Sequence, residues 1–134
     1  MSDPSLVLQG AILSALNADA TVASLVSGRI YDNPPENPAY PYITLGPDQV
    51  IGDRADCYAS SDVFLTLNVW SRSVGFPEAK RIADAIRQAL HEANLFLSGH
   101  RLIDISFESA RYLREDGLTS RAIVILKALT EPTD

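Results

Sequence analysis

The stretch from Asp62 to Ser71, DVFLTLNVWS, decides the fold because its side chains alternate with a period of two. One side of this extended segment carries Val63, Leu65, Leu67 and Val69, and the other carries Phe64, Thr66, Asn68 and Trp70. The second side is also partly apolar. The pattern therefore predicts a central strand, or a strand whose second face contacts a partner.

A long amphipathic helix is predicted directly after this strand, over residues 77–93. The preceding turn ends at Pro77, a residue type that suits the first position of a helix. Apolar side chains then recur along one stripe, at Ala79, Ile82, Ala83, Ile86, Leu90 and Ala93. The charged residues lie outside this stripe, so we expect the apolar side of the helix to pack on the sheet.

The chain closes with a pattern typical of a long β-hairpin, whose arms cover residues 102–114 and 118–130. We expect one face of the first arm to carry Ile103, Ile105 and Phe107, and the second arm to align Ala122, Val124, Leu126 and Ala128. Asp116-Gly117 between the arms predicts a two-residue turn. That turn places Phe107 opposite Leu126 and Ile105 opposite Ala128, so the apolar sets coincide across the pair.

The N-terminal part of the sequence is typical of two helices. The first is expected to start near Pro4 and to end near Asn17 and Ala18. Asp19 can cap a second, short helix over residues 20–26, which Gly28 is expected to end in the left-handed conformation.

Two long irregular segments lie on either side of a strand predicted over residues 42–46. Residues 32–41, DNPPENPAYP, contain four prolines, which favour an ordered loop or a polyproline-like arm over a helix or a central strand. Residues 47–60 are polar and predict a long excursion or a hairpin between two strands. Loops this long are usually functional or disordered. Their tyrosines suit protein contacts, or they pack back onto the sheet.

These elements predict one α+β domain over residues 1–134. It has a mainly antiparallel sheet of four or five strands, two helices packed on one face, and long loops. Residues 131–134 are expected to form a frayed tail. The single cysteine excludes a disulfide within the chain. We see no secretory signal and no membrane span, so we expect a protein made in the cytoplasm that contacts no membrane.

The charge of the chain is distributed unevenly. Its net charge is −6, and residues 1–67 carry two basic and eight acidic side chains, whereas residues 68–134 carry nine of each. Specific binding to DNA needs a cationic stripe that displaces counterions from phosphates, and the sequence has none. The acidic surface favours solubility and lets nucleic acid pass without sticking.

No group of residues has the spacing of a reactive site. Arg54 is the only cationic residue near Cys57 in the sequence, so no base is evident that would activate the thiol. His91 lacks a second histidine four residues on, so the helical zinc motif is absent. The patterns of a nucleophile elbow and of phosphate-binding loops do not occur. We therefore predict no enzyme activity, no metal and no cofactor.

Four short motifs together resemble the tail-terminator, or tail-completion, proteins of long-tailed phages and their relatives in gene transfer agents. The motifs are Gly28-Arg29-Ile30-Tyr31-Asp32, Tyr40-Pro41-Tyr42-Ile43, Val69-Trp70-Ser71 and Asp116-Gly117. The resemblance covers about residues 5–130. Each motif fits a role in the fold or in a turn, and none fits a catalytic role.

The resemblance implies a structural virion protein that forms a homo-oligomer, a hexameric ring on the head-proximal end of the tail tube. The ring stops the addition of tube protein and presents a surface to the head-closure or connector protein. DNA passes through its lumen without specific binding. These expectations come from the family and not from composition or spacing.

A closed ring needs heterologous contacts, in which one patch meets a different patch of the next subunit. We expect Val50, Ile51, Arg54 and Tyr58 to contact the tail tube or a neighbouring subunit. The proline-rich segment, with Pro34, Pro35 and Tyr40, is expected to be an arm between subunits. The acidic side chains expected along the lumen are Asp48, Asp53 and Asp56.

Two other functions remain open from the sequence. The first is a different component of the head–tail junction, such as a head-closure or adaptor ring. The second is a small enzyme or ligand-binding domain, which would need a deep pocket with perturbed ionisable groups.

Overall fold

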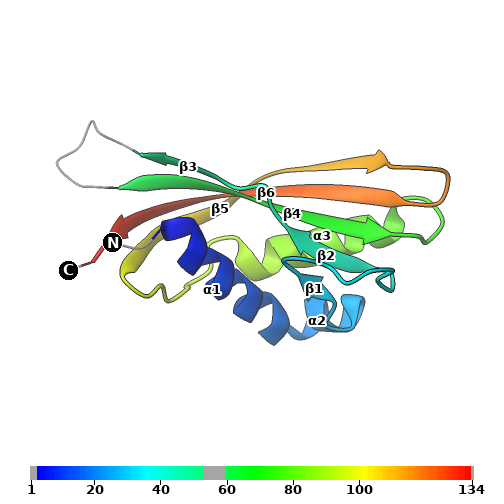
Figure 1. The fold of residues 1–134 in the computed structure, drawn as a ribbon, viewed down its shortest axis with the longest axis horizontal. Helices are drawn as coiled ribbons and strands as arrows, with labels where there is room; N and C mark the ends of the chain where they lie inside the picture. Colours follow the sequence, from blue (N-terminus) through cyan, green and yellow to red (C-terminus); the bar gives the residue numbers. More distant parts are fainter. Residues whose placement is uncertain (1–2, 53–59, 134) are drawn as a thin grey trace.

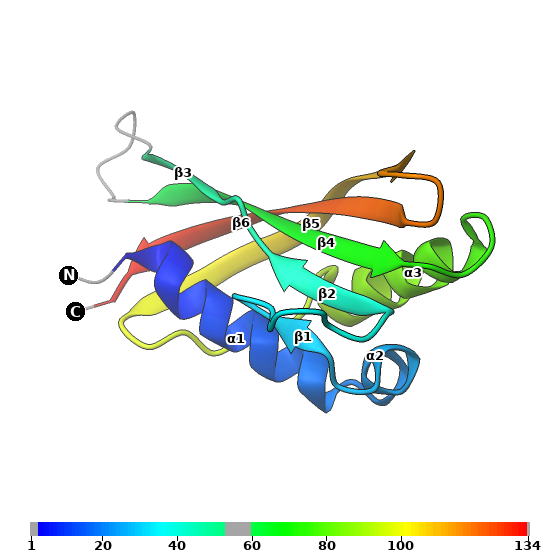
Figure 2. The ribbon, with the colours of Figure 1, turned by 45° about the vertical axis from the view of Figure 1, so that its right-hand side comes forward.

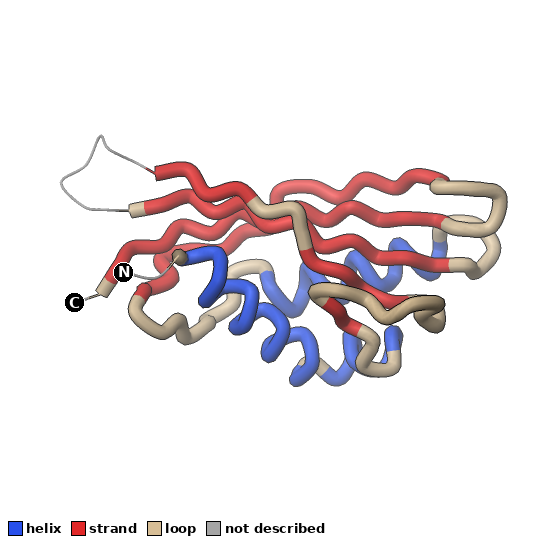
Figure 3. The backbone as a smooth tube through the Cα atoms, viewed as in Figure 1, coloured by secondary structure: helices blue, strands red, loops and turns tan. Residues whose placement is uncertain are grey.

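The computed structural model describes residues 3–52 and 60–133 and confirms the α+β class. The described chain forms two layers, a sheet and a layer of helices that covers one of its faces (Figures 1 and 3). The helices are α1 (Pro4–Ala18), α2 (Ala20–Val26) and α3 (Pro77–Leu90). The strands are β1 (Ile30–Tyr31), β2 (Tyr42–Leu45), β3 (Gln49–Gly52), β4 (Ser61–Ser71), β5 (His100–Arg114) and β6 (Ser120–Pro132).

Strand β4 is central, as its two-sided pattern predicts. The sheet has the order β1-β2-β4-β6-β5, and β3 pairs with the first half of β4, along the same side as β2 (Figure 2). Only β1 and β2 run parallel, and the other pairs are antiparallel. The two edges of the sheet are therefore β5 on one side and β1 with β3 on the other.

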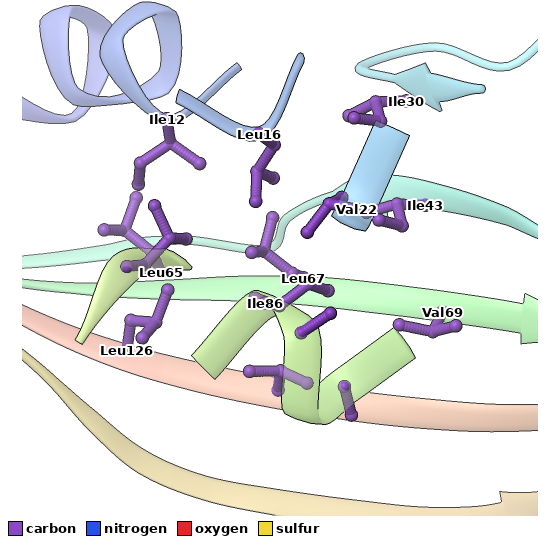
Figure 4. Packing of buried hydrophobic residues seen from close by; sticks show 14 of the residues in the cluster. Ile12, Leu16, Val22, Ile30, Ile43, Leu65, Leu67, Val69, Ile86 and Leu126 are labelled. Carbon is purple, nitrogen blue, oxygen red and sulfur yellow. The ribbon is translucent and has the colours of Figure 1, made fainter. Parts of the chain in front are cut away.

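The hydrophobic core lies between the sheet and the helices. The apolar side of β4 is buried as predicted, because Leu65 pairs with Leu126 and Leu67 with Val124 on the face that the helices cover. Buried side chains from α1, α2 and α3 pack against this layer, among them Ile12, Leu16, Val22 and Ile86 (Figure 4).

Side-chain caps fix where the N-terminal helices begin. Asp3 accepts a hydrogen bond from Ser5 N at 2.9 Å, and Asp19 accepts one from Val22 N at 3.0 Å, as expected for N-cap aspartates. Ser27 and Gly28 both adopt positive φ after α2. No single helix in the described residues is long and apolar enough to cross a membrane, and α1 and α2 meet that test only together, as a pair bent by 84°.

Several expected boundaries differ from the structure. The third helix ends at Leu90, three residues early, because His91 is extended and Glu92 has a φ of 58°. The last strand includes Glu131 and Pro132, so the frayed tail expected over residues 131–134 is wrong for these residues. Arg101 forms an ion pair with Glu131 there. Residues 49–52 form the separate strand β3 within the predicted excursion and pair antiparallel with β4, which agrees with the hairpin alternative.

The predicted two-residue turn at Asp116-Gly117 is wrong. Arg114 pairs with Ser120, and the Asp116 carboxylate accepts hydrogen bonds from Leu118 N and Thr119 N at 2.8 and 2.7 Å, so the turn is longer. These bonds lower the pKa of Asp116. Phe107 nevertheless faces Leu126, and Ile105 faces Ala128, as predicted. A register shift between Phe107 and Ser109 compensates for the longer turn.

A second register shift explains why Ile103 does not share the buried face of Ile105. The ladder of β5 and β6 skips Ile103 between Leu102 and Asp104, so this residue has no partner in the register. Its side chain is 47% exposed, whereas Ile105 is buried. The expected grouping of Ile103 with Ile105 and Phe107 is therefore wrong.

Candidate assembly interface

The proline-rich segment, residues 32–41, lies against its own subunit at its C-terminal end. Arg29 donates to the carbonyl oxygens of Pro41 and Tyr40 at 2.9 and 3.2 Å. Tyr40 is half-buried, and so is Pro34, whereas Pro35 is exposed. Of the three residues predicted for an arm between subunits, Pro35 is thus the most available to a neighbour, and the role of the arm stays a prediction.

An aromatic cluster holds this segment to the sheet. The Tyr42 ring lies 5.0 Å from Tyr40, 6.0 Å from Tyr31 and 6.1 Å from Trp70 between ring centroids. The Arg72 guanidinium lies 4.4 Å from the centroid of Tyr40. Tyr31, Tyr40 and Tyr42 therefore pack on the sheet, which was one of the two roles expected for these tyrosines.

The titration of Tyr42 gives a test of this cluster. Burial, followed by the hydrogen bond with Tyr40, raises the pKa of Tyr42 from 10.0 to about 12. Since the unfolded chain loses this proton first, the free energy of unfolding is expected to fall between pH 10 and 12. Urea unfolding of the native protein and of Tyr42→Phe across this range measures the effect. The free energy of unfolding of Tyr42→Phe should fall less steeply with pH than that of the native protein. Equal slopes for the two proteins would contradict the raised pKa of Tyr42.

The predicted contact residues Val50 and Ile51 lie on β3, and both are partly exposed, at 41% and 44%. Val50 pairs with the buried Val63 and lies on the helix-covered side, whereas Ile51 pairs with Asp62 on the opposite side. The predicted contact residues Arg54 and Tyr58, and the predicted luminal residues Asp53 and Asp56, lie outside the described residues, as does Cys57.

Asp48, at the start of the same hairpin, carries an uncompensated charge among other acids. Partial desolvation raises the pKa of Asp48, and the negative charges of Asp32 and Asp3 raise it further. A long hydrogen bond from Thr66 N, at 3.4 Å, opposes this shift. These three carboxylates thus form an acidic edge next to β1 and β3, while a luminal position for Asp48 stays a prediction.

Replacing Asp48 by asparagine is expected to raise the midpoint of thermal unfolding at neutral pH. The raised pKa means that the folded chain holds the charged carboxylate less favourably than the unfolded chain does. The gain should vanish as the pH falls below the ordinary value of 3.8, where the carboxyl is protonated in both states. Calorimetry of both proteins over this range checks the sign, and a lower midpoint for the variant at neutral pH would refute it.

The face of the sheet away from the helices carries a polar and aromatic network. Arg121 donates to Asn68 Oδ1 at 3.1 and 2.8 Å and to Glu115 at 2.8 Å, and its guanidinium lies 4.8 Å from the centroid of Trp70. Trp70 Nε1 donates to Thr44 Oγ1 at 2.9 Å. This network explains why the side of β4 that carries Asn68 and Trp70 is partly polar.

Two further surfaces had no signal in the sequence. One is an open groove of about 620 Å³ between α1 and residues 94–98, flanked by Leu6 and Phe96, which are 66% and 90% exposed. The other is the edge of β5 over residues 109–114. A periodic sequence pattern indicates neither surface. A loop forms one side of the groove, and backbone groups, which are the same for every sequence, form the edge of β5.

The histidines take structural positions. His91 Nδ1 accepts a hydrogen bond from Phe107 N at 3.0 Å, and His100 is buried at the start of β5. Within the two described stretches, no three histidine, cysteine, aspartate or glutamate side chains gather as metal ligands would.

Comparison with known proteins assigns the chain to a family. The model of the family described as tail completion protein gp17 matches residues 10–131. The chain belongs to this family. A chain in the virion of a native gene transfer agent particle is 32% identical, with a TM-score of 0.90 over 98% of this chain and 99% of that one. Tail completion proteins are structural, so the chain is a structural protein of a phage-type virion tail.

A second solved structure shares the fold of this tail completion protein. The gp17 protein of bacteriophage SPP1 has a TM-score of 0.62 and is 18% identical, over 97% of this chain and 91% of that one. The search of curated proteins found no match. The resemblance inferred from the four motifs is thereby confirmed at the level of the family.

Proposed function

We propose that this tail completion protein forms a hexameric ring on the head-proximal end of the tail tube. The ring stops the polymerisation of tube protein and joins the tail to the head-closure or connector protein. The observation that carries the proposal is the likeness to a virion chain of a gene transfer agent over nearly the full length of both chains. A role by shape alone requires contact surfaces and no reactive group.

The distribution of charge supports passage of DNA through the lumen of the ring. The chain has a net charge of −6, and the excess lies in the first half. An acidic lumen repels phosphates. It also lacks the cationic side chains that would release counterions from the DNA and so bind it. Asp48, Asp53 and Asp56 are the residues proposed to contribute to it.

Tube length is the direct readout of termination. Purified tube protein should polymerise into long tubes alone and into shorter, length-limited tubes when this protein is added during assembly, as counted in electron micrographs. Unchanged tube lengths would reject termination. Binding to a portal-associated ring without binding to tubes would instead identify a head-closure or adaptor component.

A further inference from the structure

Strand β5 forms one edge of the sheet, and half of that edge is open. The end of α3 covers the other half, because Glu92 N donates to Ile105 O at 2.8 Å and His91 accepts from Phe107 N. Residues 109–114 follow the register shift between Phe107 and Ser109 and pair regularly with β6 alone. In the described chain no strand pairs with their free side, so their outward N–H and C=O groups are a template for another strand.

Strand β3 forms the opposite edge of the sheet. It pairs with β4 on one side, and no other strand of the described residues pairs with it. All four of its residues are exposed, and two of them are the apolar Val50 and Ile51. An exposed apolar edge strand favours association unless charge or cover protects it.

The two edges carry opposite charges. The open half of β5 presents the exposed Arg111 and Arg114, and the Lys80 ammonium lies 5.2 Å from the Tyr112 ring centroid beside them. Two nearby acids are paired within the subunit, Glu115 with Arg121 and Asp84 with Arg87. Asp116 accepts hydrogen bonds from backbone N–H groups of the turn, and Glu108 lies at the register shift between Phe107 and Ser109. Asp48 directly precedes β3, and the negative charges of Asp32, after β1, and Asp3, at the start of α1, act on it, while Arg29 is bound to carbonyl oxygens.

We propose that residues 109–114 of one copy of this chain pair edge to edge with β3 of a second copy. Each edge is thus occupied by the opposite edge of a second copy of the chain, and the complementary charges of the two edges favour this pairing. The contact is heterologous, so it can repeat around a ring and close. The inference rests on the proposed ring and names its subunit contact.

Backbone pairing would supply the affinity of such a contact, and alternate side chains would supply its specificity. Ile51 lies on the side of the sheet away from the helices, because its partner Asp62 pairs with Leu129 there. Ser109, Arg111 and Leu113 lie on the same side, since they pair with Ile125, Ile123 and Arg121. Ala110 and Tyr112 lie on the helix-covered side, opposite the buried Val124 and Ala122.

Disulfide trapping tests this geometry. In a Cys57→Ser background, Ile51→Cys is combined in turn with a cysteine at residue 109, 110, 111, 112 or 113, and the protein is oxidised after assembly on tube protein. We expect ladders of covalent oligomers with at least one of residues 109, 111 and 113, and none with 110 and 112. Ile51→Cys alone should give no covalent dimer. Equal trapping at both sets, or dimers from the single variant, would overturn the contact.

Charge reversal gives an independent test. Arg111→Glu is expected to lower the fraction of capped tubes by about tenfold or more, because it places like charges across the contact. Adding Asp48→Lys should restore capping. Arg81→Glu, on the exposed side of α3, is the matched control and should cap normally. Failure of the rescue, or equal loss in the control, would count against the pairing.

The failures of the two proposals are distinguishable. If the native protein limits tube length but no cysteine pair is trapped, the edge contact is wrong and the terminating ring stands. If the native protein does not act on tubes at all, the proposed function is wrong. Ladders formed by the free protein would then still support the edge contact.

Discussion

Replacing Ile86 by alanine is expected to lower the free energy of unfolding by about 2–5 kcal/mol. Ile86 is fully buried on the side of α3 that faces the sheet, within the cluster that joins all three helices to β4 and β6 (Figure 4). Truncation removes apolar contact and leaves a cavity that a close-packed core fills poorly. Urea unfolding monitored by circular dichroism measures the difference.

The matched control for this substitution is Gln88→Ala on the same helix. Gln88 is exposed and donates a hydrogen bond to the exposed Asp84 Oδ2 at 2.8 Å, so its loss is expected to change the stability by less than about 0.5 kcal/mol. Similar effects of the two substitutions would show that α3 does not pack as described.

Replacing both Val50 and Ile51 by aspartate is expected to reduce the capping of tubes by about a hundredfold and to leave the protomer folded. Both side chains are exposed in the protomer, so the fold does not depend on their burial. In an assembly they would meet another surface, where an unpaired carboxylate is strongly unfavourable. Counting capped tube ends in micrographs, with circular dichroism as the check on folding, measures both effects.

Val74→Asp is the control for this prediction. Val74 is 95% exposed and follows β4 at the other end of the strand, away from β3. The same chemical change at this position should leave capping unaltered. Normal capping by the double variant, or an equal loss in Val74→Asp, would show that β3 makes no specific contact.

Much of the fold followed from periodicity. The alternation along β4 depends on one face being buried, so the sequence alone identified the strand, its buried side and its central place. The hairpin register was correct at Phe107 and Ile105 although the turn was wrong. The Asp116 carboxylate binds two backbone N–H groups and lengthens the turn, and the register shift before Ser109 restores the pairing. Neither feature has a periodic signature.

The candidate site was less accessible to sequence reasoning. Val50 and Ile51 were predicted as apolar contact residues in a long loop, but four residues are too few for a period to reveal a strand. The open half of β5 depends on where the end of α3 lies against the backbone of Ile105, which only the folded structure specifies. Tyr40 and Tyr42 were as consistent with packing as with contact, and the structure shows that they pack.

We propose that this tail completion protein acts by binding, as a ring of several copies, to the end of a tube. The most direct measurement is cryo-electron microscopy of tubes assembled with the protein, with averages computed from the tube ends. We expect a ring of six copies at one end only, with neighbours joined through β3 and β5. Bare ends, or copies bound along the wall of the tube, would contradict it.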